Sequence, residues 1–160
     1  MHDVPVLPPP PVSDVVLLDY PVQLGAAQQE HFDGVVRELQ LIALSSRETS
    51  RHLAGRLLEL VSTLTRDHAV GLAEPERQRE QALIEGRATV DLHYPVTPDA
   101  AAIVQAWARM LRDIDELCRT DDLLVLERPS DIVLMQDWVL GQFLAQLAGQ
   151  PPTGWTGPLA

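Results

Sequence analysis

The feature that most constrains the fold is a run of apolar residues at alternating spacings of four and three within residues 98–119. This spacing places apolar side chains on one face of an α-helix, while charged and amide side chains fill the opposite face. The preceding Thr97-Pro98-Asp99 supplies a capping hydroxyl, a proline suited to the first turn and an acid. The pattern predicts a helix over 98–119 with one buried seam, formed by Ile103, Trp107, Met110, Ile114 and Leu117.

Similar patterns predict further helices over 26–44, 45–68 and 131–148, and a short charged helix over 75–85. Ser45 and Glu48 form a capping box, and Gly71 is a suitable stop for the helix that follows them. We therefore expect an all-α fold: a four-helix bundle built from two helical hairpins, with the charged helix on its surface. The expected core includes Leu39, Leu57, Leu60, Trp107, Met110 and Ile114.

Two segments that precede predicted helices resemble each other. Leu18-Asp19-Tyr20-Pro21-Val22 matches Leu92-His93-Tyr94-Pro95-Val96, and the apolar positions of the following helices match after a one-residue insertion. One interpretation is an internal repeat, in which an extended lead-in and a helical hairpin occur twice and pack face to face. The alternative is coincidence, because any two amphipathic helices align at helical spacing.

The rest of the chain is predicted from its prolines and glycines. Residues 89–94 alternate like a strand, but the segment is short and stops at Pro95. The proline-rich residues 1–13 and the proline- and glycine-rich residues 151–160 are expected to be flexible tails. This division leaves residues 14–150 as a single helical domain within a chain of 160 residues.

Charge and composition exclude several classes of function. The chain has a net charge of −11 and no lysine, so it should repel phosphate backbones and anionic lipids, and we expect no nucleic-acid or membrane partner. The single cysteine, Cys118, cannot form an intramolecular disulfide, which fits a cytoplasmic location. No signal peptide or long apolar span is recognisable.

Motifs for catalysis or cofactor binding are missing from the sequence. It has no Glu-x-x-His pair for a di-metal bundle, no phosphate-binding glycine loop and no nucleophile elbow. Cys118 is best interpreted as a buried structural thiol. We therefore expect no metal, no cofactor and no catalytic residue, although an enzyme of unknown type is kept as a third possibility.

The last predicted helix is apolar around most of its circumference. Such a helix is either central to the fold or part of an interface, and the sequence leaves both open. If it is an interface, Trp138, Phe143 and the nearby Trp155 are the candidate partner-binding residues, because aromatic side chains commonly anchor interfaces. The partner would be another protein of unknown identity, or a second copy in a homodimer.

Residues 17–43 (LLDYPVQLGAAQQEHFDGVVRELQLIA) and 138–155 (WVLGQFLAQLAGQPPTGW) resemble a family of small, acidic, helical proteins of actinobacteria. That family is associated with genes for anti-sigma kinases and their antagonists. The resemblance implies a signalling or partner-switching accessory rather than an enzyme. The leading hypothesis is therefore a cytosolic regulatory or protein-interaction module. The alternative is a sensor that binds a small apolar ligand between the two helical hairpins.

Overall fold

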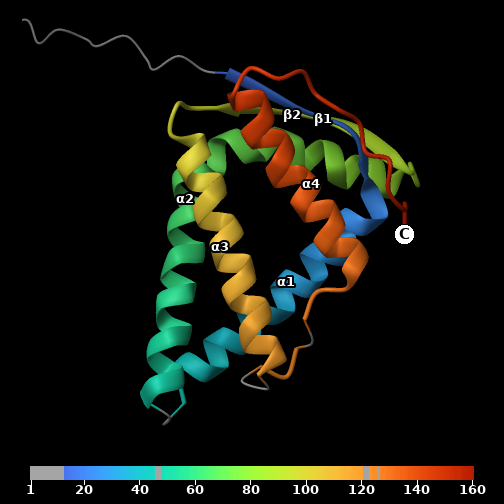
Figure 1. Ribbon diagram of the computed structural model, residues 1–160. Coiled ribbons are helices and arrows are strands. Elements are labelled where there is room, and N and C mark those ends of the chain that lie inside the picture. The colour runs from blue at the N-terminus through green and yellow to red at the C-terminus, as the bar shows by residue number, and fades with distance from the viewer. Residues whose placement is uncertain (1–12, 46–47, 121–122, 126) are drawn as a thin grey trace, which may run out of the picture.

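The computed structural model of the protein describes residues 13–45, 48–120, 123–125 and 127–160, except for the side chains at 49 and 67–70. The order of elements is β1 (Ser13–Pro21), α1 (Val22–Ala43), α2 (Glu48–Ile84), β2 (Thr89–Val96), α3 (Ala100–Arg119) and α4 (Ser130–Leu147). Most of these residues are helical, but β1 and β2 form an antiparallel sheet that packs against the helices (Figure 1). The expectation of an all-α four-helix bundle is therefore wrong, and the fold is mixed α/β. No helix among the described residues combines the length and apolar character needed to cross a bilayer.

The two strands pair with Ser13 opposite Val96 and Leu17 opposite Leu92, and the register then shifts before Tyr20 meets Val90. Leu18 and Asp19 together lie opposite Asp91, so the irregularity is a β-bulge in β1. Asp19 has a φ of 55°, a left-handed conformation that Asp tolerates better than most residues. Because of the bulge, the Asp19 side chain does not follow the regular alternation of side chains along β1.

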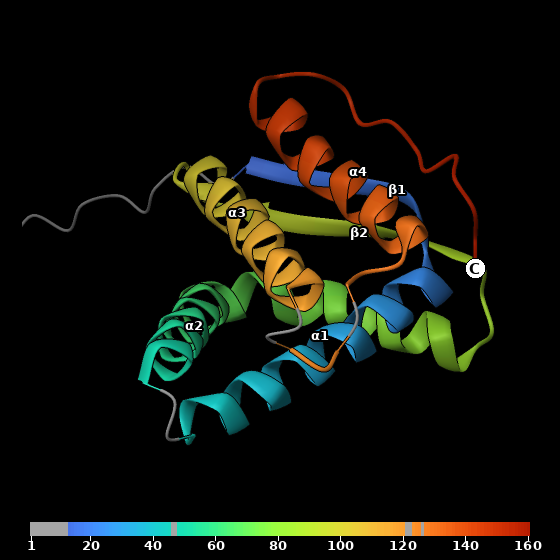
Figure 2. The ribbon, with the colours of Figure 1, turned by 60° about the horizontal axis from the view of Figure 1, so that its bottom comes forward.

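A first hydrophobic core lies beneath the sheet. Inward-facing side chains of both strands pack on the start of α1, on the second half of α2 (residues 71–84) and on α4. Figure 2 shows α4 on the β1 side of the sheet and the second half of α2 on the β2 side. The buried members of this core are Leu17, Tyr20, Val22, Leu24, Ala82, Val90, Leu92, Met135 and Trp155.

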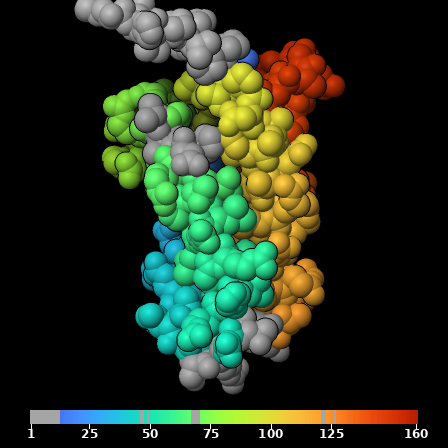
Figure 3. Space-filling model, turned by 90° about the vertical axis from the view of Figure 1, so that its left-hand side faces the viewer, coloured from blue at the N-terminus to red at the C-terminus, as the bar shows by residue number. Residues whose placement is uncertain are grey.

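A second core is helical and lies at the other end of the molecule, among α1, the first half of α2 and α3. Figure 3 shows α2 between α1 and α3 on this face. Leu39, Leu57, Met110 and Ile114 are buried here, as the apolar spacing predicts, and Leu60 and Trp107 are partly buried against them. The remaining buried members are Val35, Ala54, Cys118 and Leu123.

The charged segment over 75–85 is not a separate surface helix. It continues α2, which runs for 37 residues through Gly71 and Pro75. Pro75 has no N–H to donate to the carbonyl of Gly71, and the helix changes direction between its two halves (Figure 1). Gly71 allows a close approach to β2, since a Cβ there would lie 3.1 Å from the Pro95 carbonyl oxygen. The stop expected at Gly71 is therefore absent, because tertiary contacts favour continuation.

The two matching lead-ins are the two strands. They pair antiparallel, as two copies related by a two-fold axis would, and α2 contacts β2 while α4 contacts β1. The second helices of the two units differ in length, with 37 residues in α2 and 18 in α4. An internal repeat is compatible with this arrangement and stays a prediction.

The two expected tails have different outcomes. Residues 1–12 lie outside the described residues, and Ser13 is the first residue of β1. The C-terminal segment, residues 150–160, does not extend away from the domain. It folds back along α4 and β1, and Trp155 is buried with only 9% of its surface exposed.

Candidate functional site

The three predicted partner-binding residues pack against the chain itself. The Trp138 and Trp155 rings meet edge to face, with centroids 5.4 Å apart, and Phe143 meets Tyr94 of β2 in the same way at 5.2 Å. Trp155 is buried, whereas Trp138 and Phe143 are half-buried. These contacts place all three in the core beneath the sheet, and the large apolar side chains that α4 leaves exposed are Leu134 and Leu144.

The outer edge of β1 is covered by α4 and the C-terminal segment. The Val16 N–H donates to Gln146 Oε1 at 2.9 Å, and Gln146 Nε2 donates to the Val16 carbonyl at 2.7 Å. Two residues further on, the Leu18 carbonyl accepts from the N–H of Trp155 at 3.0 Å. This edge therefore cannot pair with another strand unless the C-terminal segment moves.

The outer edge of β2 is open from Thr89 to His93, whereas α2 approaches it at Pro95, whose carbonyl oxygen would lie 3.1 Å from a Cβ on Gly71. In an antiparallel ladder, two opposed residues either bond each other or both turn their backbone N–H and carbonyl groups outward. Val16 turns its N–H and carbonyl away from β2, so the opposed His93 turns its own away from β1. The same alternation turns outward the backbone groups of Thr89 and Asp91. Among the described residues, none forms a hydrogen bond with the outward N–H groups of Asp91 and His93. The open edge is thus a row of unpaired backbone donors and acceptors.

A groove with a volume of about 790 Å³ lies between this edge and the second half of α2, and we call it the acidic groove. One wall is a stripe of α2 side chains at helical spacing, and the other is the start of β2. Asp19 reaches the groove from the β-bulge, where its N–H donates to Asp91 Oδ1 at 2.8 Å. The groove is lined by Asp19, Glu74, Arg77, Gln78, Glu80, Gln81, Ile84, Glu85, Arg87, Thr89, Val90 and Asp91.

The groove carries more negative than positive charge, with five carboxylates against two guanidinium groups. Both arginines are already paired: Arg77 contacts Glu74, and Arg87 lies 3.8 Å from Glu85. Among the described residues, no cationic side chain pairs with Asp19, Glu80 or Asp91. The groove can therefore stabilise a cation that comes from outside the chain.

Amide groups add hydrogen-bonding capacity to the α2 wall of the groove. Gln78 Nε2 donates to Glu74 Oε1 at 3.2 Å, while Gln78 Oε1 is buried and accepts no hydrogen bond from the described residues. Gln81 Nε2 donates to Glu85 Oε1 at 2.7 Å. A neighbouring glutamate thus holds each of the two amides along the α2 wall.

A buried polar cluster holds the α2 wall against the sheet. Arg79 lies near the Tyr20 hydroxyl, and a Cβ at Gly25 would overlap the Tyr20 ring. Burial raises the pKa of Tyr20, although the nearby Arg79 acts in the opposite direction. Burial also raises the pKa of Tyr94, and the neighbouring Tyr20 raises it further. Both hydroxyls therefore stay neutral near pH 7, and Arg79 keeps its positive charge beneath the groove.

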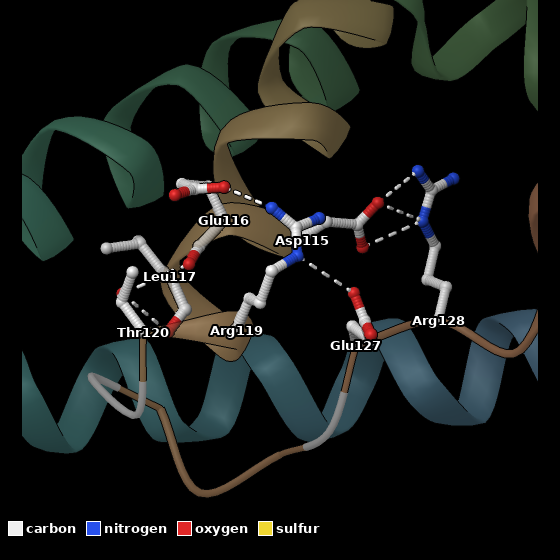
Figure 4. Close-up of polar contacts among 7 residues, drawn as sticks. All are labelled: Asp115, Glu116, Leu117, Arg119, Thr120, Glu127 and Arg128. Carbon is white, nitrogen blue, oxygen red and sulfur yellow. Dashed lines mark hydrogen bonds and ion pairs between the residues drawn. The ribbon is translucent and has the colours of Figure 1, made fainter.

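A second polar cluster fixes the segment between α3 and α4 (Figure 4). Arg128 makes a bidentate ion pair with Asp115, with Nε 3.0 Å from Oδ1 and Nη2 2.6 Å from Oδ2, and also donates to Gln136 of α4. Both charged side chains are largely buried, at 7% and 13% exposed. Arg119 pairs with Glu116 and with Glu127 rather than with Asp115. This cluster is structural, because it faces the helices rather than a cavity.

A small apolar cavity of about 150 Å³ lies between the two helical hairpins, close to the second core. Ser50 is the polar residue in the lining of this cavity. The other lining residues are Leu39, Ile42, Leu53, Ala54, Leu117 and Leu123.

The described residues contain no group of three or more His, Cys, Asp or Glu side chains that could hold a metal ion. Comparisons with protein-family models, with curated proteins and with solved structures found no match to the chain.

The sequence did not reveal the acidic groove, because its residues come from two distant parts of the chain, Asp19 and residues 74–91, and form no motif. Asp19 and Asp91 become neighbours only when the two similar lead-ins pair antiparallel. The alternation of residues 89–94 was the available signal, since it predicts a strand and a strand needs a partner.

Proposed function

We propose that this chain is a protein-interaction module, and that an extended segment of a partner protein binds in the acidic groove by adding a strand to β2. In this binding mode, backbone hydrogen bonds supply affinity, and the side chains that flank the edge supply specificity. A signalling accessory, the role that the sequence resemblance implies, would use such a surface to bind its partner.

The observation that carries this proposal is the difference between the two sheet edges. The β1 edge is covered by Gln146 and Trp155, whereas the β2 edge faces a groove and keeps its outward N–H groups unpaired. Sheets commonly cover or blunt their edges against unwanted pairing. An edge left open beside a concave surface therefore supports a role in binding.

The test uses peptides selected from a random library against the full chain. Strand addition should protect the amides of Asp91 and His93 from hydrogen exchange when a selected peptide is bound. A His93→Pro variant removes one outward donor at an edge position, where proline is tolerated. It should weaken binding up to about tenfold, the effect of one lost hydrogen bond.

The matched control is His93→Ala, which loses the same imidazole but keeps the N–H, and should bind as the parent does. Circular dichroism verifies that both variants fold. Selected peptides that bind the parent and His93→Pro equally, without protecting these two amides, would show that strand addition is wrong.

A second candidate function rests on the apolar cavity between the hairpins. A cavity of this size, lined by aliphatic side chains, can hold a molecule as small as benzene. If the chain senses such ligands, benzene should raise its melting temperature, because a ligand that binds only the folded state stabilises it. Ala54 lines the cavity, so Ala54→Met should fill it and abolish the increase. An unchanged melting temperature at saturating benzene would reject this function.

A further inference from the structure

We infer that the segment bound by the acidic groove is basic, with an Arg or Lys opposite Asp91. This inference rests on the proposed strand addition and names the chemistry of the partner. Its basis is the placement of the unpaired carboxylates relative to the open edge of β2.

Asp91 places a carboxylate beside the open edge. Its side chain lies on the outer face of the sheet, because Val90 and Leu92 on either side point into the core. Asp19 lies next to it, and neither carboxylate has a cationic partner among the described side chains. A residue of an added strand that faces outward opposite Asp91 would therefore meet the Asp91 carboxylate, whereas the Asp19 carboxylate lies one strand further away, beside Gly154. Opposite charges directly across a strand pair stabilise the pairing.

The alternate residues of the same segment would face the α2 wall. That wall presents the amides of Gln78 and Gln81, the apolar Ile84 and the unpaired carboxylate of Glu80, while its Glu74 and Glu85 are already paired with arginines. Polar side chains such as Thr suit the positions beside the amides. The two walls therefore favour a basic residue opposite Asp91 and polar residues beside α2.

Charge disfavours two other occupants. A second copy of the chain, pairing β2 with β2, would bring together two grooves that each carry more negative than positive charge. The chain's own residues 1–12 contain no Arg or Lys and five prolines, which cannot donate to a ladder. The groove thus fits a basic segment of another protein.

Synthetic peptides test this inference. An alternating Arg-Thr peptide should bind the full chain in isothermal titration calorimetry, whereas alternating Gln-Thr and Glu-Thr peptides of the same length should not. Affinity for the Arg-Thr peptide should fall as NaCl rises, because salt screens exposed charges.

Variants of the groove locate the charges. Asp91→Asn keeps an acceptor for the Asp19 N–H but removes the charge, and should weaken Arg-Thr binding up to about fivefold. Asp19→Asn should weaken binding less than Asp91→Asn, because the Asp19 carboxylate lies one strand further from the added segment. Glu59→Gln, an exposed change on α2 outside the groove, is the control and should bind as the parent does.

The outcomes separate this inference from the proposed function. Equal binding of the Arg-Thr and Gln-Thr peptides, with the Asp91 and His93 amides protected, would overturn the basic preference and leave strand addition standing. Arg-Thr binding that depends on Asp91 but leaves those amides exchanging freely would reject strand addition alone. No binding of any of these peptides, or analytical ultracentrifugation showing a dimer that His93→Pro dissociates, would overturn the inference.

Discussion

The side-chain amide of Gln146 in α4 forms the hydrogen bonds with Val16 that a neighbouring strand would otherwise make. Its Oε1 accepts from the Val16 N–H at 2.9 Å, and its Nε2 donates to the Val16 carbonyl at 2.7 Å. Gln142, one turn earlier, does the same for the C-terminal segment, where its Oε1 accepts from the Thr153 N–H at 2.9 Å. Two glutamines on one helix face thus satisfy backbone groups of β1 and of the C-terminal segment.

Replacing Gln146 with Leu should destabilise the fold by about 1–3 kcal/mol, because it leaves two backbone groups of Val16 without partners. Urea denaturation measures this loss, and faster hydrogen exchange of the Val16 amide would locate it at the β1 edge. Gln150→Leu is the control, since Gln150 is exposed and its side chain makes no hydrogen bond with the described residues. Equal stability of the two variants would contradict the role given to Gln146.

Trp155 should anchor the C-terminal segment. Trp155→Ala removes a buried ring that packs on Trp138, and should cost about 3–5 kcal/mol of stability if the site does not collapse. Limited proteolysis should then cleave within 150–160 faster than in the parent. Leu159→Ala, at a side chain that is 45% exposed, should change neither property. A variant as stable as the parent would mean that the segment contributes nothing to the fold.

The apolar spacing was sufficient to predict the helices and most of the second core, because helical periodicity is a local signal. It could not predict the sheet. Val15 to Leu18 is apolar at every position, so β1 lacks the alternation typical of a strand, and its partner lies more than 70 residues away. The continuity of α2 through Pro75 was equally hidden, because it depends on packing against β2.

The candidate site was predicted less well than the fold, for the same physical reason. Trp138, Phe143 and Trp155 have the chemistry of interface anchors, but residue type does not reveal whether a ring is covered by the same chain. Trp155 lies among prolines and glycines that predict flexibility, but it is held by its ring contact with Trp138, by its N–H bond to Leu18 and by burial in the first core. The acidic groove depends on a strand pairing that no local pattern contains.

The ion pair between Asp115 and Arg128 should be the most sensitive polar contact of the fold. Asp115→Ala leaves the Arg128 guanidinium buried without its main partner, so the expected cost is about 3–5 kcal/mol. Asp113→Ala, at an exposed position two residues earlier on α3, should stay within about 0.5 kcal/mol of the parent. Urea denaturation compares the two, and a cost below 1 kcal/mol for Asp115→Ala would show that water replaces the carboxylate.

Cys118 is only 6% exposed, and burial raises the pKa of its thiol to about 11, with the nearby Asp115 and Glu38 carboxylates adding to the shift. An unfolded cysteine has a pKa of about 8.5, so the folded state favours the neutral thiol. The favourable contribution of that neutral thiol is fully present below about pH 8.5 and is lost as the pH rises toward 11. The free energy of unfolding should therefore fall over this alkaline range, and a Cys118→Ser variant should lose less stability there.

The same shift predicts how the thiol reacts. Only the thiolate attacks iodoacetamide, so at pH 8 the folded chain should be alkylated at least about 100-fold more slowly than the chain unfolded in urea. Mass spectrometry follows the labelling over time, with Cys118→Ser as the background. The rate should rise about tenfold for each pH unit up to the pKa, provided that the chain stays folded. Rapid labelling of the native protein at pH 8 would mean that Cys118 is not held in the core between α1 and α3.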